Sequence, residues 1–290
     1  MSLYDEVLAR RDYVSDIRMV IDSNIVEYDI EKANLNILYK YGKIDDKTYD
    51  MVYHMDRYNR QYFMGNFIRD NHLSSTLAEG IKKAKLAFLE KNEVPLVSLL
   101  EIRNDALFII NPSILYPELD DITFKAKSIY YDYLELNNMS IFFTRDMLMT
   151  YFEVKGMPNR VVDLHIPYLL KSFDNIINIY KRDKRNAIKQ LHGLYNDYIE
   201  RKLDIGYYRP FNIFSQYEFR TSCSQFNLNY VPEQYKNAID ISFNERILRE
   251  FHSLLLQDTL WDKIYPHIGI AYMGYFVFFI VKVNVYDCIL

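Results

Sequence analysis

The sequence predicts an α+β fold, in which an antiparallel sheet with helices precedes a mostly helical region. Short apolar runs rich in β-branched residues alternate with polar breaks in the first half of the chain, as is typical of antiparallel strands. Amphipathic helical patterns dominate after Pro158. Strands concentrated early and helices concentrated late favour an α+β architecture over a regular alternation of the two.

Two β-hairpins are expected before the middle of the chain. Residues 17–21 and 25–30 are β-rich runs separated by a short polar segment with common turn residues. Residues 96–100 and 106–110 are apolar runs joined by a tight polar turn. This second pair predicts a hairpin with Asp105 near its tip.

Helices are expected around and between these hairpins. A short helix is predicted within residues 1–15, and a helical pattern follows directly after Asp29. Residues 46–71 and 74–91 also have helical patterns, and the second of these has serines at its start that are N-cap candidates.

The second half of the chain is predicted to begin with strands and continue with helices. An irregular, aromatic stretch is expected at residues 204–235, and an apolar run at residues 268–281 favours a buried strand. The remaining predictions are strands at 141–144 and 151–154, and helices at 166–182, 185–201 and 243–256.

Composition limits the class of protein. A chain of 290 residues that is 50% hydrophobic can bury a large core, and its length leaves one or two domains open. The 27 tyrosines and 18 phenylalanines argue against disorder. The net charge of −4 excludes a protein that is basic overall. Nucleic-acid binding would therefore require local clusters of Lys and Arg.

The expected location is the cytoplasm, that of an infected host cell if the protein is viral. Cys223 and Cys288 are the two cysteines, which is too few for a disulfide framework or a zinc site and suits a reducing compartment. The N-terminus lacks the apolar core of a signal peptide. The apolar run at 268–281 is shorter than the roughly 20 residues that span a bilayer, so no membrane association is expected.

Two aspartates are candidates for a shared site. Asp29 ends a predicted strand and is followed by a helix, and Asp105 lies at a predicted hairpin tip. Phosphoryl transfer with two metal ions needs carboxylates that converge from separate elements. Mg²⁺ is bound by few carboxylates together with water and substrate phosphates. Surface turns are also rich in Asp, so ordinary turns are the favoured interpretation of the pair taken by itself.

The surrounding segments resemble, in order, the motifs of family B DNA polymerases. Residues 27–38 resemble motif A, where an Asp ends a strand before a helical turn. Residues 57–65 resemble motif B, with Arg57 at the place of a phosphate-binding Lys. Residues 97–110 resemble the hairpin of motif C, in which Asp105 falls on the ligand position and Arg103 replaces the first acid.

This resemblance implies catalytic and nucleotide-binding roles. Asp29 and Asp105 would be the catalytic residues and would hold two Mg²⁺ ions. Arg57 and Arg60 would grip an incoming nucleoside triphosphate, since guanidinium forks suit phosphate. Asn34 takes the place of the aromatic residue that screens the sugar 2′-OH, which implies weaker discrimination against ribonucleotides. Helix salt bridges are the alternative interpretation for the two arginines.

The partners implied are a nucleic-acid template and primer, nucleoside triphosphates and a larger viral or replication assembly. Solvent-facing lysines and a loop packed between domains remain the alternatives for the implied nucleic-acid contacts. The residues implied to contact nucleic acid are Lys125, Lys127, Lys155, Tyr208 and Arg209.

The resemblance also implies a domain organisation. Residues 1–157 would form a palm-like domain whose reduced fingers are about residues 43–92. Residues 158–290 would form a helical, thumb-like domain with a C-terminal strand. The leading hypothesis is thus a compact template-dependent nucleotidyltransferase, a DNA or RNA polymerase or a primase-like enzyme.

Two alternatives remain open at the level of the sequence. The first is a catalytically inactive phage factor derived from a polymerase, which binds nucleic acid or protein. Arg103 in place of an acid favours this alternative, because its charge would oppose a second metal ion. The second is an unrelated α+β phage protein, in which Asp29 and Asp105 would not meet.

Overall fold

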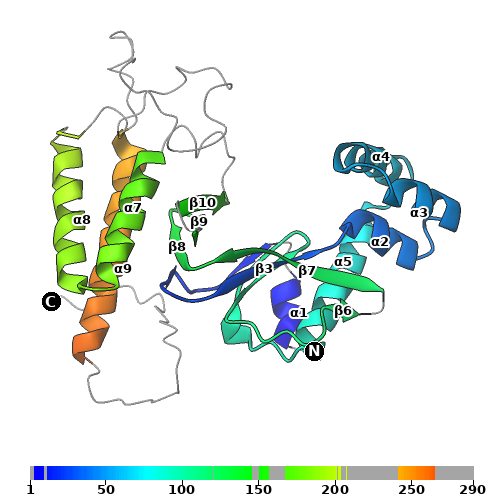
Figure 1. Ribbon diagram of the computed structural model, residues 1–290, viewed down its shortest axis with the longest axis horizontal. Helices are drawn as coiled ribbons and strands as arrows, with labels where there is room; N and C mark the ends of the chain where they lie inside the picture. The colour runs from blue at the N-terminus through cyan, green and yellow to red at the C-terminus, as the bar shows by residue number, and fades with distance from the viewer. Residues whose placement is uncertain are drawn as a thin grey trace, which may run out of the picture. The chain divides into compact units, whose positions relative to one another are not determined.

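The computed structural model describes residues 3–9, 12–119, 121–145, 150–156, 167–200, 202–203, 207 and 241–264. These residues form antiparallel sheets and helices, which confirms the predicted α+β class (Figure 1). The chain divides into two compact units. The first comprises Met1–Ser15 and Asn24–Ile129, and the second comprises Asp16–Ser23 and Tyr130–Leu290.

The first unit is built on a sheet with the strand order β1-β4-β5-β3-β7-β6. The β4–β5 hairpin is antiparallel, and its register pairs Arg103 with Ala106. β5 also pairs antiparallel with β3, so that Ala106 faces Asp29. The predicted hairpin with Asp105 at its tip is therefore confirmed. The strand bounds are β1 Asp12–Val14, β3 Ile25–Ile30, β4 Leu99–Arg103, β5 Ala106–Ile110, β6 Glu118–Leu119 and β7 Ile122–Tyr130.

Three helices, α1, α2 and α5, share a hydrophobic core with this sheet. Leu8, Ile37 and Phe88 from the helices join Leu107 and Phe124 from the strands in one buried cluster. Burial of such side chains is the main stabilising contribution to the unit. The helices of the first unit are α1 Leu3–Leu8, α2 Ala33–Lys40, α3 Asp46–Tyr53, α4 Arg57–Asp70 and α5 Ser74–Lys91, with a 3₁₀ turn at Leu96–Ser98.

A smaller cluster attaches α3 and α4 to α2. Leu35 and Leu38 of α2 pack with Val52 of α3 and Met64 of α4. α4 buries little else: Met64 is its buried residue, while Tyr58 and Tyr62 are exposed. This packing sets the position of the first turn of α4 relative to the first turn of α2.

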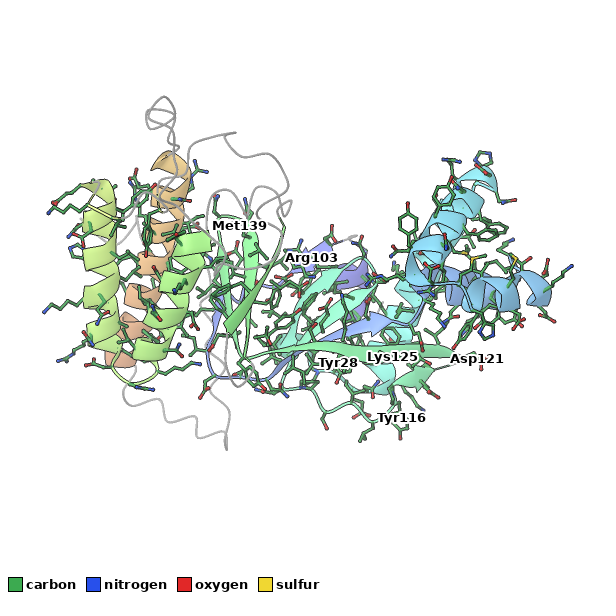
Figure 2. The ribbon with its side chains drawn as sticks, turned by 45° about the horizontal axis from the view of Figure 1, so that its top comes forward. Tyr28, Arg103, Tyr116, Asp121, Lys125 and Met139 are labelled. Atoms are coloured by element: carbon green, nitrogen blue, oxygen red, sulfur yellow. The ribbon has the colours of Figure 1, made fainter. Side chains whose placement is uncertain are left out.

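Strand alternation separates apolar from charged side chains on β3. Tyr28 and Ile30 contact the cluster formed with the helices. Successive side chains of a strand point to opposite faces, so Glu27 and Asp29 lie on the other face of the sheet. The side chains are drawn in Figure 2, where Tyr28 marks β3 and Lys125 marks β7.

The second unit combines a sheet of order β10-β9-β8-β2 with three described helices. Phe143 of the sheet, Phe173, Leu191 and Phe251 of the helices lie in its buried cluster. None of the described helices is both long and apolar enough to cross a membrane. The elements are β2 Met19–Val20, β8 Asp132–Leu136, β9 Met139–Arg145, β10 Thr150–Lys155, α7 Pro167–Tyr180, α8 Lys184–Ile199 and α9 Ile241–Ile264.

The predicted hairpin between residues 17–21 and 25–30 is wrong. β2 pairs with β8 of the second unit, whereas β3 pairs with β5 of the first. The polar segment between β2 and β3 connects two sheets, and its backbone amides bond to Tyr131 and Asp132 of the second unit. Pairing with distant strands therefore decides where β2 and β3 lie, despite the turn residues between them.

Two details of the predicted helices also differ. The pattern at 46–71 is divided into α3 and α4, because the side chain of Asp56 accepts hydrogen bonds from the Tyr58 and Asn59 amides and begins a new helix. α5 spans the predicted residues 74–91, but its N-cap is Leu73 and makes no side-chain cap hydrogen bond. The serines that follow Leu73 are thus the first helical residues.

Several predictions lie outside the described residues. These are the boundary between residues 157 and 158, the C-terminal strand at 268–281 and almost all of the aromatic stretch at 204–235. Within the described residues, strands β8–β10 and helices α7–α9 belong to the same compact unit.

Candidate functional site

A pocket of about 350 Å³ lies in the first unit where β3 ends and α2 begins. Asp29 and Asp105 line it together with Asn34, Arg57 and Arg60. Lys127, a predicted nucleic-acid contact, also lines it, so six side chains predicted from four separate segments lie at this pocket. The other lining residues are Ile30, Lys32, Ala33, Leu35, Gln61 and Met64.

Sheet register explains why the two aspartates meet. Asp29 is opposite Ala106, the residue after Asp105. The Ile30 amide lies 3.4 Å from the Asp105 carbonyl oxygen, which joins the end of β3 to the hairpin tip. Asn104 adopts a left-handed conformation with φ 47°, which is a backbone state that Asn tolerates better than most residues. The tight turn thus places Asp105 in the lining of the pocket.

The electrostatics of Asp29 reflect this convergence. The pKa of the Asp29 carboxyl is raised from 3.8 to about 6, mainly by burial and also by the neighbouring Asp105, against the lowering effect of Lys127. A nearby carboxylate disfavours the ionised form of Asp29, and a cation beside the pair would favour it.

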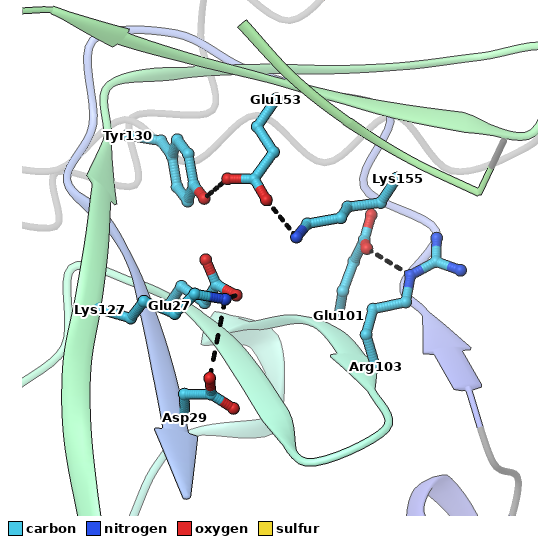
Figure 3. Close-up of polar contacts among 8 residues, drawn as sticks. All are labelled: Glu27, Asp29, Glu101, Arg103, Lys127, Tyr130, Glu153 and Lys155. Atoms are coloured by element: carbon cyan, nitrogen blue, oxygen red, sulfur yellow. Dashed lines mark hydrogen bonds and ion pairs between the residues drawn. The ribbon is translucent and has the colours of Figure 1, made fainter. Parts of the chain in front are cut away.

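Lys127 of β7 is a cation already at the pocket. Its Nζ lies 2.8 Å from Glu27 Oε1 and 3.6 Å from Asp29 Oδ2 (Figure 3). The Glu27 side chain is only 1% exposed, whereas that of Asp29 is 31% exposed. A buried carboxylate requires a partner, so the shorter contact anchors the ammonium group at Glu27.

The first turn of α2 forms another wall. Lys32 precedes the helix with φ 45°, and no side chain caps this end. Ala33 and Asn34 of the first turn line the pocket. The amide groups of a helix N-terminus carry a partial positive charge that favours anions. The Lys32 ammonium group itself lies 2.9 Å from the centroid of the Tyr53 ring.

The first turn of α4 supplies the two arginines. Asp56 caps this helix, and Arg57 and Arg60 follow in its first turn. Arg60 Nη1 donates a 2.9 Å hydrogen bond to the Met55 carbonyl oxygen, which restrains this side chain. Arg57 is exposed. The pocket therefore has carboxylates on the side of the sheet and guanidinium groups on the side of α4.

Lys85 supports the hairpin tip from α5 and was missed by the sequence analysis. Its side chain is buried, and its Nζ donates a 2.7 Å hydrogen bond to the Asn104 carbonyl oxygen. Burial lowers the pKa of Lys85 from 10.5 to about 8, against the opposing effect of Asp105 and Asp12. The available signal was its helical spacing with Ile81 and Leu89, which places a lysine on an apolar face.

Arg103 is directed to a carboxylate outside the pocket. Its Nε lies 2.9 Å from Glu101 Oε2, and the Glu101 side chain is fully buried (Figure 3). Arg103 does not line the pocket that Asp29 and Asp105 share. Arg103 should therefore repel a metal ion in the pocket less than the sequence suggested, because its charge is directed to Glu101.

The remaining predicted residues do not line the pocket. Lys125 is exposed and pairs with Glu31 at 2.6 Å. Lys155 belongs to the second unit, where it pairs with Glu153. Tyr208 and Arg209 lie outside the described residues.

The donor set of the pocket suits a hard cation. Within the described ranges, no group of three or more His, Cys, Asp or Glu side chains is placed to hold a metal ion. Asp29 and Asp105 nonetheless form a pair of adjacent carboxylates, and Mg²⁺ characteristically uses one or two carboxylates with water and phosphate oxygens. The pair therefore fits Mg²⁺ that is completed by a phosphorylated ligand.

Comparison with known protein families gives a match over most of the chain. The sequence model of the family described as "Bacteriophage PBS1 gene 130 protein" matches residues 2–257. This description names a phage protein and no activity. No curated protein matches the sequence.

Proposed function

The chain belongs to the bacteriophage PBS1 gene 130 protein family, and we propose that it is a template-dependent nucleotidyltransferase that uses two Mg²⁺ ions. Its substrates would be nucleoside triphosphates and a primed nucleic-acid strand. Its setting would be the cytoplasm of the infected host cell, within a larger phage replication assembly.

One observation carries this proposal. The pocket of the first unit combines two adjacent carboxylates with two arginines and a helix N-terminus. Carboxylates hold divalent cations, while guanidinium groups and helix N-termini bind phosphate. A metal–triphosphate complex presents both kinds of group, so it is the ligand class that complements this pocket.

Each residue has a distinct role in this proposal. Asp29 and Asp105 would hold the Mg²⁺ ions, which when bound supply charge neutralisation at the attacking and leaving oxygens. Arg57 and Arg60 would orient the triphosphate from α4. Catalysis of phosphoryl transfer depends mainly on such positioning and on electrostatic stabilisation, and requires no covalent protein intermediate.

Asn34 would lie beside the sugar of the nucleotide. Its side chain is exposed in the first turn of α2 and lines the pocket. A small polar side chain leaves room for a 2′-OH, so we expect both ribonucleotides and deoxyribonucleotides to be accepted. An Asn34→Tyr variant would then favour deoxyribonucleotides.

Primer extension tests the proposal directly. The full chain is incubated with a primed template, Mg²⁺ and either type of nucleotide, and product length is measured. Asp29→Asn and Asp105→Asn should each abolish extension, since each removes a metal-binding carboxylate. Asp70→Asn is the matched control, because Asp70 is exposed at the end of α4 and does not line the pocket. Extension that survives both pocket substitutions would refute the proposed chemistry.

A second candidate is a catalytically inactive phage factor that binds nucleic acid or protein. The contact between Lys127 and Asp29 favours it, because a resident ammonium group lowers the need for a metal ion. This candidate predicts that the protein binds no Mg²⁺–nucleotide complex. Calorimetric titration with a nucleoside triphosphate in the presence and absence of Mg²⁺ separates the two candidates, since Mg²⁺-dependent binding supports only the first.

A further inference from the structure

We propose that Lys127 is a resident counter-ion that competes with divalent cations for Asp29, so that it sets the metal affinity of the pocket. This inference rests on the proposed metal-binding role of Asp29 and Asp105 and concerns its regulation. It gives Lys127 a role distinct from the nucleic-acid contact implied by the resemblance.

The geometry of the two contacts carries the argument. Lys127 is 2.8 Å from Glu27 but 3.6 Å from Asp29, and Glu27 is the more deeply buried of the two acids. Glu27 and Asp29 are two residues apart on β3 and therefore lie on the same face of the sheet. The ammonium group is thus held in place by Glu27 and extends its charge to Asp29.

The positive charge of Lys127 affects the binding of a metal ion to Asp29. Opposite charges 3.6 Å apart attract each other strongly in a partly buried site. A divalent cation that binds Asp29 meets the repulsion of the ammonium group and must weaken the longer contact. Because the shorter contact with Glu27 can remain, Lys127 need not leave the sheet for the metal to bind.

The same strand offers a matched control. Lys125 is two residues before Lys127 and pairs with Glu31 at 2.6 Å, so it is also a β7 lysine paired with an acid. It does not line the pocket. Replacement of Lys125 removes an equal charge from the same strand without removing the contact with Asp29.

The test measures Mn²⁺ and Mg²⁺ affinity by calorimetry with the full chain, in the absence of nucleotide and nucleic acid. We expect Lys127→Met to bind the metal about tenfold more tightly than the natural protein, as the loss of one adjacent positive charge implies. Lys125→Met should bind within about twofold of it. Metal binding by a folded Lys127→Met variant that is equal or weaker overturns the inference.

A second variant keeps the test informative if Lys127→Met does not fold. That substitution leaves the buried Glu27 without the Lys127 ammonium group as a partner. Glu27→Gln combined with Lys127→Met removes both charges, and circular dichroism reports whether each variant is folded. The double variant should still bind Mn²⁺ more tightly than Glu27→Gln alone. Equal affinity of these two variants overturns the inference.

The outcomes also separate this inference from the proposed function. If the natural protein binds Mn²⁺ and Lys127→Met binds it no more tightly, the inference fails and the metal site stands. If neither binds Mn²⁺, the inference fails, and the titration with a nucleoside triphosphate and Mg²⁺ decides the proposed function separately. If only Lys127→Met binds Mn²⁺, the inference is supported and the inactive phage factor is favoured.

Discussion

Lys85 of α5 donates a hydrogen bond of 2.7 Å from its Nζ to the carbonyl oxygen of Asn104. This contact ties a buried helix residue to the tip of the β4–β5 hairpin. Since Asp105 is the next residue, the helix supports one of the two carboxylates that define the pocket. The support has an electrostatic cost, because burial opposes the charged form of Lys85.

The first prediction concerns the stability of the protein at alkaline pH. The pKa of Lys85 is lowered from 10.5 to about 8 by folding, so between these values the unfolded chain binds more protons than the folded one. The free energy of unfolding should therefore rise with pH from about 8, by roughly 2 kcal/mol at pH 9.5. Lys85→Met should remove this rise. Urea unfolding at pH 7.5 and 9.5 measures the free energy of unfolding of both proteins.

Lys83→Met is the control for this experiment, since Lys83 is on the same helix but exposed. It should retain the pH dependence of the natural protein. An equal rise in Lys85→Met would contradict the role assigned to Lys85.

The second prediction concerns stability at acidic pH. Folding raises the pKa of Asp29 from 3.8 to about 6, so the folded chain binds more protons between these values and stability falls as pH rises through them. Asp29→Asn avoids this loss and should be more stable at pH 7.5 by about 1–2 kcal/mol, after discounting for solvent screening. At pH 4 the gain should largely disappear. Urea unfolding at both pH values measures the difference, with Asp70→Asn as a control that shows no such change.

The third prediction concerns the binding of phosphate by α4. Arg57→Ala should weaken Mg²⁺-dependent binding of a nucleoside triphosphate by about tenfold or more, because a hydrogen bond to a charged group contributes about 1.5–3 kcal/mol. Arg60→Ala should weaken it similarly and also remove the hydrogen bond to Met55. Arg69→Ala is the matched control, since Arg69 is an exposed arginine at the other end of α4. Calorimetry measures all three, and an equal loss in Arg69→Ala would indicate a nonspecific charge effect.

The fourth prediction concerns the packing of α2 on α5. A Cβ at Gly80 would clash with Cγ2 of the buried Ile37, so the close approach of the two helices requires glycine. Gly80→Ala should destabilise the protein by about 1–3 kcal/mol, as overpacking of a core does. Gly65→Ala of α4 has open space around its Cβ and should be neutral or stabilising by up to about 1 kcal/mol. Thermal unfolding compares the two variants.

The features that the sequence determined by itself are local. The β4–β5 hairpin, the helix at residues 74–91 and the position of Asp29 near a strand end follow from hydrophobic periodicity and turn residues. Such patterns depend on neighbours within a few residues, and they report which face of an element is buried. The order of the motif-like segments selected six of the residues that line the pocket, namely Asp29, Asn34, Arg57, Arg60, Asp105 and Lys127.

Only the tertiary structure decided which elements meet. It assigned β2 and β3 to different sheets, despite the turn residues between them. It also placed Lys127 against Glu27 and Asp29, and Lys85 beneath Asn104. Periodicity shows that a residue is buried but not against what, because strand pairing and ion pairs between distant segments depend on the free energy of the whole fold.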